Sequence, residues 1–389
     1  MRATVLQDPR LARHAGRFVW LEIDGENERN AAFLEKFPVQ AYPSLVVIDP
    51  GEERAILKWP GTATVDELER LLADATRALR NGARGADAVL VRADRAHAEW
   101  DTALATKLYA DAIAQGGVAW PRRGRAAETL LYLLSFDNPQ RCASEADRLL
   151  PTLGEGSSAA NVAITGLGCA GDLPADAPDR TALTARLEQS TRAALRFPKL
   201  LPIDRLAVYE TLHAAREQAK DAEGARAIAG EWWTAVLEVR AAAKGARARA
   251  AYVEPLAAAA IANGRPADAL PGLAADERAL PGDYDPPYYT ARILAKLGRG
   301  PEALAAADRA LANAYGPRRL RIQDLRATLQ EEQGDRAGAR VTLESAVAEA
   351  AKLPRAQLRN RERRLEQKLQ QRLAALTSAE PRASSGEHR

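Results

Sequence analysis

Hydrophobic positions follow two different patterns along this chain. Before residue 82, three short stretches are dense in β-branched and aromatic residues, which predicts strands over Phe18–Asp24, Ser44–Ile48 and Glu53–Trp59. From about Ala86 onward, apolar residues recur at helical spacing, with only short Gly, Pro and Asp breaks between them. The pattern therefore predicts an α/β segment followed by an all-α segment.

Helices are expected on either side of these strands. Thr4–Ala15 and Ala31–Phe37 have helical spacing, and Pro38 closes the second of them. Thr64 and Glu67 are spaced as a capping box, which predicts that a helix starts there. One face of that helix is apolar: Leu68, Leu71, Leu72, Ala75 and Leu79. The second and third strands are joined by a short turn, so they should be antiparallel.

The stretch Ala41-Tyr42-Pro43-Ser44 lies between a helix end and a strand. Taken alone, the Tyr-Pro bond is expected to be trans, because cis X-Pro bonds are a small minority in folded proteins. A trans proline is also tolerated at the first residue of a strand. The order of the surrounding elements changes that expectation.

That order is helix, strand, helix, proline loop, strand, strand, helix, and over residues 1–82 it resembles the second half of a thioredoxin. The resemblance matches Pro43 to the cis proline beside that family's active site, and Gly61 to the glycine after its last strand. It therefore implies a partial thioredoxin-like α/β domain with a cis Tyr42–Pro43 bond. It also implies a peptide-binding edge formed by Ala41, Tyr42, Pro43 and Ser44.

The chain departs from that family at its start. A thioredoxin carries a Cys-x-x-Cys pair and a central strand ahead of the elements found here, whereas the first cysteine of this chain is Cys142. A missing central strand would leave buried backbone groups unpaired, which is costly. We therefore expect a domain that is incomplete at its N-terminus, with its coding region continuing upstream of Met1. An in-frame stop codon with no Cys-x-x-Cys before it would contradict this expectation.

An internal repeat runs through the helical segment. Gly264, Gly298 and Gly334 recur at spacings of 34 and 36 residues. Each is followed by alanines at fixed offsets: Ala269, Ala303 and Ala339, then Ala310 and Ala346. The pattern resembles tetratricopeptide (TPR) repeats, in which a glycine turn joins two helices and small residues let them pack closely.

Weaker copies at Glu99–Leu104 and Ala222–Arg226 extend this resemblance over residues 86–350, for four to six helical hairpins. Such a stack is a TPR-like α-solenoid whose concave face binds proteins. Leu353–Leu376 reads as a basic amphipathic helix that either meets an acidic partner or caps the solenoid, and capping is preferred. Residues 377–389, rich in Ser and charge, are predicted to be disordered.

Two further motifs have more than one interpretation. Gly166–Gly171 matches G-x-G-x-x-G, but Pro174 follows where a dinucleotide site needs a helix. A close-packed helix capped by Ser157 or Ser158 is therefore preferred. Asp283–Tyr289 joins two repeats and can present acidic and aromatic groups to a ligand, although a rigid loop that covers a helix end is the commoner arrangement.

The cysteines and histidines suggest no catalytic or metal site. Cys142 and Cys169 can pair, but two buried thiols are the more common arrangement. The histidines show no ligand spacing: His14, His97, His213 and His388. We expect no metal, no cofactor and no catalytic residue within the chain.

Composition limits the remaining possibilities. The 389 residues are 47% hydrophobic and 28% charged, as in an ordinary folded protein. Because 55 basic residues nearly balance 52 acidic ones, nucleic acid is not an expected partner. No apolar run is long enough to span a membrane, and Met1–Pro9 lacks the apolar centre of a signal peptide. The compartment stays open: periplasmic or otherwise exported if a signal sequence lies upstream, and cytoplasmic if none does.

Two functions follow from these observations. In the first, the chain is a binding module that holds protein or peptide partners at the cis-proline edge and on the concave face of the solenoid. In the second, the complete protein is a thiol–disulfide oxidoreductase whose Cys-x-x-Cys lies upstream of Met1 and whose reactive sulfur would lie beside Pro43. Residues 1–389 carry no dithiol of that kind, so we expect no reductase activity from them.

Overall fold

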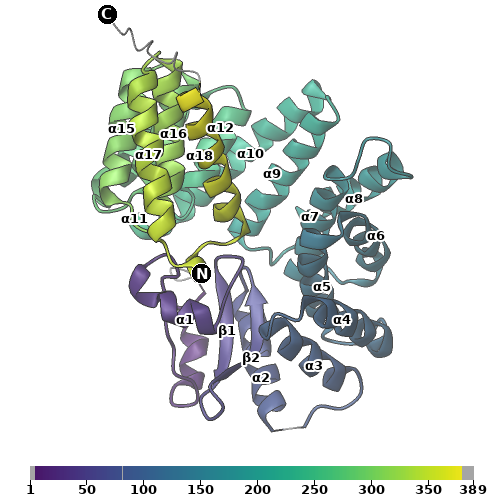
Figure 1. Ribbon diagram of the computed structural model, residues 1–389. Coiled ribbons are helices and arrows are strands. Elements are labelled where there is room, and N and C mark those ends of the chain that lie inside the picture. Colours follow the sequence, from purple (N-terminus) through teal and green to yellow (C-terminus); the bar gives the residue numbers. More distant parts are fainter. Residues whose placement is uncertain (1–4, 81, 379–389) are drawn as a thin grey trace, which may run out of the picture. The chain divides into compact units, whose positions relative to one another are not determined.

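The computed structural model describes residues 5–80 and 82–378. These residues are mostly helical and contain one sheet of two strands (Figure 1). The chain forms two compact units, and neither is continuous in sequence. Unit 1 comprises Met1–Trp20 with Ala41–Ala243, and unit 2 comprises Leu21–Gln40 with Lys244–Arg389. This division differs from the predicted domain ranges.

The sheet of unit 1 is the predicted antiparallel hairpin. Strand β1 (Ser44–Asp49) pairs with β2 (Arg54–Pro60), with Ser44 opposite Pro60 and Val47 opposite Leu57. The middle of β2 is buried, whereas every residue of β1 is only half-buried. Each strand has one paired neighbour, but helix α3 (Ala86–Ala98) also packs against β2, and this accounts for the greater burial of β2.

Helix α2 (Val65–Leu79) follows the hairpin and begins with the predicted capping box. The Thr64 hydroxyl accepts the Glu67 N–H at 3.2 Å, and the Glu67 carboxylate accepts the Thr64 N–H at 2.8 Å. Leu68, Leu71 and Leu72 are buried as expected. Leu79, at the last turn, is 46% exposed, so the buried face ends one turn earlier than predicted.

The predicted strand over Phe18–Asp24 is wrong: this stretch has no regular structure. Val19 is 87% exposed and Leu21 is 69% exposed. A strand needs a hydrogen-bonded neighbour, and within the described residues no third strand is present to pair with this stretch. The α/β part of the predicted fold is thus reduced to a two-stranded hairpin, while the helical part is confirmed.

The other N-terminal elements are short. The predicted helix over Thr4–Ala15 is a 3₁₀ helix, η1 (Pro9–His14), and Thr4 lies outside the described residues. A second 3₁₀ turn, η2 (Glu28–Asn30), leads into α1 (Ala31–Lys36), which matches the predicted helix before Pro38.

The rest of unit 1 consists of helices that pack mainly on their neighbours in sequence. Their bounds are α3 (Ala86–Ala98), α4 (Thr102–Gly116), α5 (Arg123–Asp137), α6 (Pro139–Leu149), η3 (Leu150–Thr152), α7 (Ser157–Gly171), α8 (Arg180–Ala194), α9 (Pro202–Gln218) and α10 (Ala222–Ala242). Their shared core is rich in leucine and alanine, as the low aromatic content of the chain requires.

Unit 2 is also helical. Its elements after Lys244 are α11 (Ala246–Ala250), α12 (Val253–Ala262), η4 (Pro266–Ala269), α13 (Leu270–Ala279), α14 (Asp285–Lys296), α15 (Gly300–Asn313), α16 (Arg318–Glu332), α17 (Arg336–Lys352), η5 (Arg355–Gln357) and α18 (Asn360–Ser378). Helices α16, α17 and α18 lie side by side (Figure 1).

The predicted repeats of unit 2 are helical hairpins. Gly264, Gly298 and Gly334 lie in the turns with φ of 68°, 72° and 79°, a left-handed conformation that glycine adopts at little cost. The alanines that follow them are fully buried between the helices: Ala269, Ala303, Ala310, Ala339 and Ala346. The described residues between 86 and 352 form fifteen α-helices, α3 to α17, a number that exceeds the eight to twelve of four to six hairpins.

The C-terminal helix α18 covers the end of the last hairpin. Leu365, Leu369 and Leu373 pack against residues of α16 and α17. Lys368 and Arg372 form ion pairs with Asp324 of α16 at 2.8 and 2.5 Å. The helix begins at Asn360 rather than Leu353 and reaches Ser378, and residues 379–389 of the predicted disordered tail lie outside the described residues.

Cys142 of α6 and Cys169 of α7 form a disulfide, so the preferred expectation of two buried thiols is wrong. The bond is possible because α6 and α7 pack closely, with the two Cα atoms 6.1 Å apart. Gly166–Gly171 lies inside α7, as the packing interpretation predicts. Its expected serine cap is wrong, because Gly156 precedes the helix and no side chain caps it.

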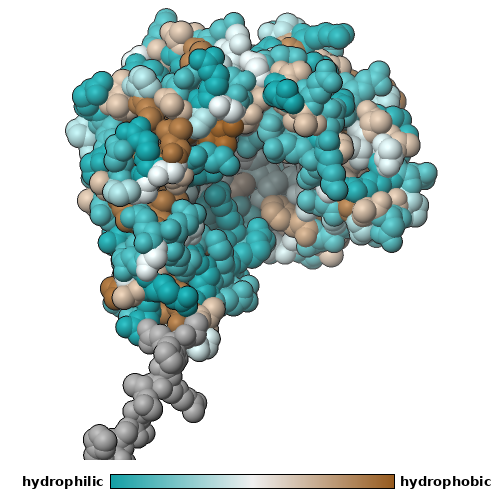
Figure 2. Space-filling view, turned by 90° about the horizontal axis from the view of Figure 1, so that it is seen from above, coloured by the Kyte–Doolittle hydropathy of each residue, from teal (hydrophilic) through white to brown (hydrophobic). Residues whose placement is uncertain are grey.

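The visible molecular surface is mostly hydrophilic, with scattered small apolar patches (Figure 2). No helix in the described part of the chain is long and apolar enough to cross a membrane.

Candidate functional site

The residues predicted to bind peptide lie together at the start of β1. The Tyr42–Pro43 bond is cis, as the thioredoxin resemblance implies. The Ser44 hydroxyl donates to the carbonyl of Ala41 at 2.7 Å, and the Gly61 N–H donates to the carbonyl of Pro43 at 2.8 Å. Tyr42 is 39% exposed beside them. These bonds fix the entry to β1 and leave the tyrosine ring accessible.

The outer edge of β1 follows directly from this entry. In the part of the chain that the structure describes, only β2 pairs with β1. Leu45 and Val47 point toward one face of the hairpin, where they pack near Phe18, Leu68 and Leu72. The backbone of β1 is therefore anchored on one face while one edge carries no strand.

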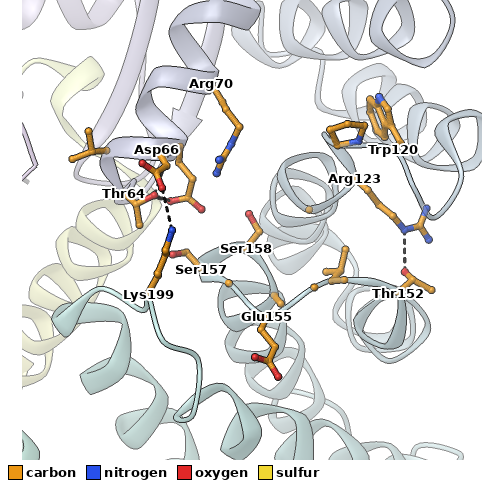
Figure 3. Close-up of a pocket in the computed structure, with 18 of the residues that line it drawn as sticks. Thr64, Asp66, Arg70, Trp120, Arg123, Thr152, Glu155, Ser157, Ser158 and Lys199 are labelled. Atoms are coloured by element: carbon orange, nitrogen blue, oxygen red, sulfur yellow. Dashed lines mark hydrogen bonds and ion pairs between the residues drawn. The ribbon is translucent and has the colours of Figure 1, made fainter. Parts of the chain in front are cut away.

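A second candidate site is a polar pocket elsewhere in unit 1, with a volume of about 610 Å³. It lies between the start of α2, the start of α5 and the glycine-rich loop that precedes α7 (Figure 3). Arg70 and Ser158 point into it from opposite walls, and Lys199 forms an ion pair with Asp66 at 3.7 Å. None of these residues was predicted as a site, because they come from distant segments of the chain.

The charges that line this pocket have both signs. The pocket is lined by basic residues that include Arg10, Arg70 and Lys199, and by acidic residues that include Asp66 and Glu155. Arg123 is already engaged, since its Nε donates to the Thr152 hydroxyl at 2.9 Å and its Nη1 donates to the carbonyl of Ile113 at 3.0 Å. The pocket thus has no uniform potential that selects an anion or a cation.

Two carboxyl groups with raised pKa values lie near the start of α2, and of these Asp204 is buried and Glu128 is half-buried. Burial raises the pKa of Asp204 to about 6, with Glu67 adding to the shift and a hydrogen bond from Thr62 at 3.0 Å opposing it. Burial also raises the pKa of Glu128 well above its ordinary value, and the Asn161 amide donates to Glu128 at 2.8 Å. Because their pKa values are raised, these groups favour the protonated form more than free carboxyl groups do.

The histidines are separated from one another. His14 packs near Phe18, His97 lies against Tyr109 and Tyr132, and His213 lies against Trp232. Burial, with Lys58 and Arg125 nearby, lowers the pKa of His97 to about 3. The described residues contain no group of three His, Cys, Asp or Glu side chains placed to hold a metal ion, and His388 lies outside them.

Comparison with known proteins gives likenesses of fold alone. No family model matches the chain. No curated protein matches its sequence.

Solved structures with a similar arrangement of helices include the following three proteins. A tetratricopeptide repeat protein from Parabacteroides merdae is 11% identical, with 73% of this chain and 98% of that chain covered and a TM-score of 0.46. The TPR2AB domain–pHSP90 complex of yeast Sti1 is 14% identical, with coverage of 73% and 98% and a TM-score of 0.28. The assembly chaperone of RpL4, Acl4 (residues 1–338), is 16% identical, with coverage of 75% and 98% and a TM-score of 0.35. At these scores the likenesses assign neither a partner nor a binding site to this chain.

Proposed function

We propose that this chain is a protein-binding scaffold of TPR-like helix pairs, with a thioredoxin-like remnant that binds an extended peptide along β1. Ala41, Tyr42, Pro43 and Ser44 form the entry to that edge. The observation that carries the proposal is the outer edge of β1, which no other strand of the described residues covers. Such an edge offers N–H and C=O groups that an extended peptide can pair with.

The burial of β1 supports the same proposal. Leu45, Val46, Val47 and Ile48 are apolar yet remain half-buried. A peptide strand beside β1 would cover part of this surface and continue the face on which Leu45 and Val47 pack. We therefore expect preferred peptides to alternate apolar and polar residues, with the apolar ones on that face.

Backbone methylation of the peptide tests this mode of binding. Peptides that bind in a fluorescence anisotropy screen are remade in two forms, each N-methylated at alternate residues, so that each form loses the N–H groups of one edge. One form should lose binding and the other should keep it, because only one edge of a peptide can face β1. Equal binding of the two forms would exclude strand pairing.

Hydrogen exchange provides the matching measurement on the protein. Peptide binding should slow amide exchange in β1, while the buried residues of β2 serve as an internal control. Protection confined to the helices would place the peptide elsewhere and contradict the proposal.

The proposal includes no reductase activity for residues 1–389. Both cysteines of the chain are joined to each other, and they lie in α6 and α7 rather than beside Pro43. Turnover by these residues in an insulin-reduction assay would refute this part of the proposal. The same assay on an upstream-extended chain tests the alternative function, in which a Cys-x-x-Cys ahead of Met1 makes the complete protein a thiol–disulfide oxidoreductase.

A further inference from the structure

Unit 2 contains an N-terminal segment that is docked on helices far away in sequence. Within it, Asp24–Asn27 forms a tight turn, called the acidic turn below. The Asp24 carboxylate accepts the Glu26 N–H at 3.0 Å, and its carbonyl accepts the Asn27 N–H at 3.2 Å. The Asn30 amide also donates to the Asp24 carbonyl at 2.8 Å. These bonds hold the Asp24 and Glu26 side chains in a fixed arrangement.

Arg318 of α16 and Arg359, which directly precedes α18, bind these carboxylates. The Arg318 guanidinium lies 2.5 Å from the Glu26 carboxylate and 3.3 Å from that of Asp24. Arg359 reaches Glu26 at 3.3 Å, and the Tyr315 hydroxyl bonds to Asp24. The side chains of Arg318 and Glu26 are only 19% and 14% exposed, so this pair is shielded from solvent.

Aromatic rings stack on Arg318 and on a second arginine of α16, Arg321. The Arg318 guanidinium lies 4.4 Å from the centre of the Tyr315 ring and 5.1 Å from that of Tyr284. Arg321 lies 5.1 Å from the Tyr284 ring and 5.4 Å from that of Tyr288. Together these five side chains form the Tyr–Arg surface. Stacked guanidinium groups lose little freedom when they bind a carboxylate, so the surface is preorganised for an acidic ligand.

The loop before α16 is shaped for the backbone of the same turn. Gly316 has φ of 56°, and a Cβ atom there would lie 2.1 Å from the carbonyl oxygen of Glu26. Any other residue would push the acidic turn away. Ion pairs, stacked aromatic rings and the backbone shape at Gly316 therefore all fit the acidic turn.

The acidic turn is not part of the core that holds the hairpins together. That core comprises residues of α14, α15 and α16 with Tyr284 and Ala314, and it includes nothing from Leu21–Gln40. The anchor of the N-terminal segment is instead α1, where Leu34 is 3% exposed. The acidic turn can therefore leave the Tyr–Arg surface while α1 and the hairpins stay folded.

We propose that the Tyr–Arg surface is a binding site for an acidic segment of a partner protein that carries two acidic residues separated by one residue, as Asp24 and Glu26 are. Within the chain, the acidic turn occupies this site. The partner's segment replaces Asp24 and Glu26 on Arg318. This site is separate from the β1 edge, and each can fail without the other.

Variants of the full chain, with a synthetic peptide as the probe, test this exchange. The probe is a fluorescent peptide with the sequence Leu21–Arg29, and its matched control carries Asp24→Asn and Glu26→Gln. The proteins are wild type, the double variant D24N/E26Q, and the same variant with R318Q. E28Q is the control protein, because Glu28 is exposed two residues after Glu26.

The acidic peptide should bind D24N/E26Q roughly tenfold or more tightly than it binds wild type or E28Q, since the internal competitor has lost its charges. Adding R318Q should remove that gain. Equal affinity for wild type and D24N/E26Q would overturn the proposal. Equal binding of the acidic and amide peptides to D24N/E26Q would also overturn it, and that comparison does not depend on the folding of the R318Q protein.

Hydrogen exchange of the wild-type chain tests independently whether the peptide displaces the acidic turn. Excess acidic peptide should speed amide exchange of Glu26 and Asn27, because their bonds to Asp24 lose the cover of the Tyr–Arg surface when the turn is released. Binding of the peptide without any change at these amides would mean that the peptide binds elsewhere, and the proposal would be wrong.

Discussion

Two glycines of α7 are expected to respond in opposite ways to the same substitution. Gly166 is buried, and a Cβ atom there would lie 2.3 Å from the Cβ of Ala146 and 3.2 Å from Leu187. Gly168, two residues later, has nothing within 4 Å of the same position. Gly166→Ala and Gly168→Ala therefore form a matched pair.

The magnitudes follow from propensity and packing. Replacing glycine by alanine inside a helix stabilises it by about 0.5–1 kcal/mol, and Gly168→Ala should show that full gain. At Gly166 the new methyl group meets the short, inflexible side chain of Ala146, so α6 and α7 must move apart. Overpacking of this kind costs about 1–3 kcal/mol, which after the helix-propensity gain leaves a net loss of up to about 2.5 kcal/mol.

Urea unfolding of the oxidised variants, followed by circular dichroism, measures the difference. Gly166→Ala should unfold at lower urea than wild type, and Gly168→Ala at slightly higher urea, with unchanged m-values. Equal stability of the two variants would refute the close packing of α6 on α7. Destabilisation by Gly168→Ala alone would instead favour a glycine loop at G-x-G-x-x-G, with the backbone conformation of a nucleotide-binding motif.

Two further predictions concern unit 1. The Cys142–Cys169 disulfide closes a loop with a sequence separation of 27, which corresponds to about 3.5 kcal/mol of stabilisation. Reduction should lower the unfolding free energy of wild type by about that amount and leave that of C142A/C169A unchanged. Two alkylatable thiols in the unreduced, denatured protein would contradict the disulfide. Burial raises the pKa of Asp204 to about 6. The protonated carboxyl group therefore contributes to the free energy of unfolding below pH 4, and this contribution is lost as pH rises through 6. Asp204→Asn should therefore stabilise the protein by about 1–3 kcal/mol at pH 8 and by little at pH 4, measured by chemical unfolding at the two pH values. A larger stabilisation at pH 4 than at pH 8 would refute the raised pKa of Asp204.

Local features of the fold could be predicted from the sequence. The capping box at Thr64 depends on residues three positions apart, and the turns at Gly298 and Gly334 depend on one residue each. The cis bond at Pro43 was expected from the resemblance of this segment to a thioredoxin. In each case the interactions that decide the structure lie within a few residues or within one supersecondary unit.

Features that depend on distant residues could not be predicted in the same way. Phe18–Asp24 has the composition of a strand, but no strand in the described part of the chain lies beside it to complete a ladder. The Cys142–Cys169 bond required the close approach of two helices. Asp24 and Arg318 meet across most of the chain, and nothing near either residue marks the other as its partner.

The discontinuity of unit 2 has a consequence for synthesis on the ribosome. Glu26 and Arg318 are separated by 292 positions, so the acidic turn emerges long before the helix that binds it. At about 5–20 residues per second, this interval is roughly 15–60 s. Throughout that time Leu21–Gln40 has no folded surface to dock on, and it is open to chaperones and proteases. A chain that ends prematurely before α16 lacks Arg318, so this segment stays without the ion pairs that hold it in unit 2.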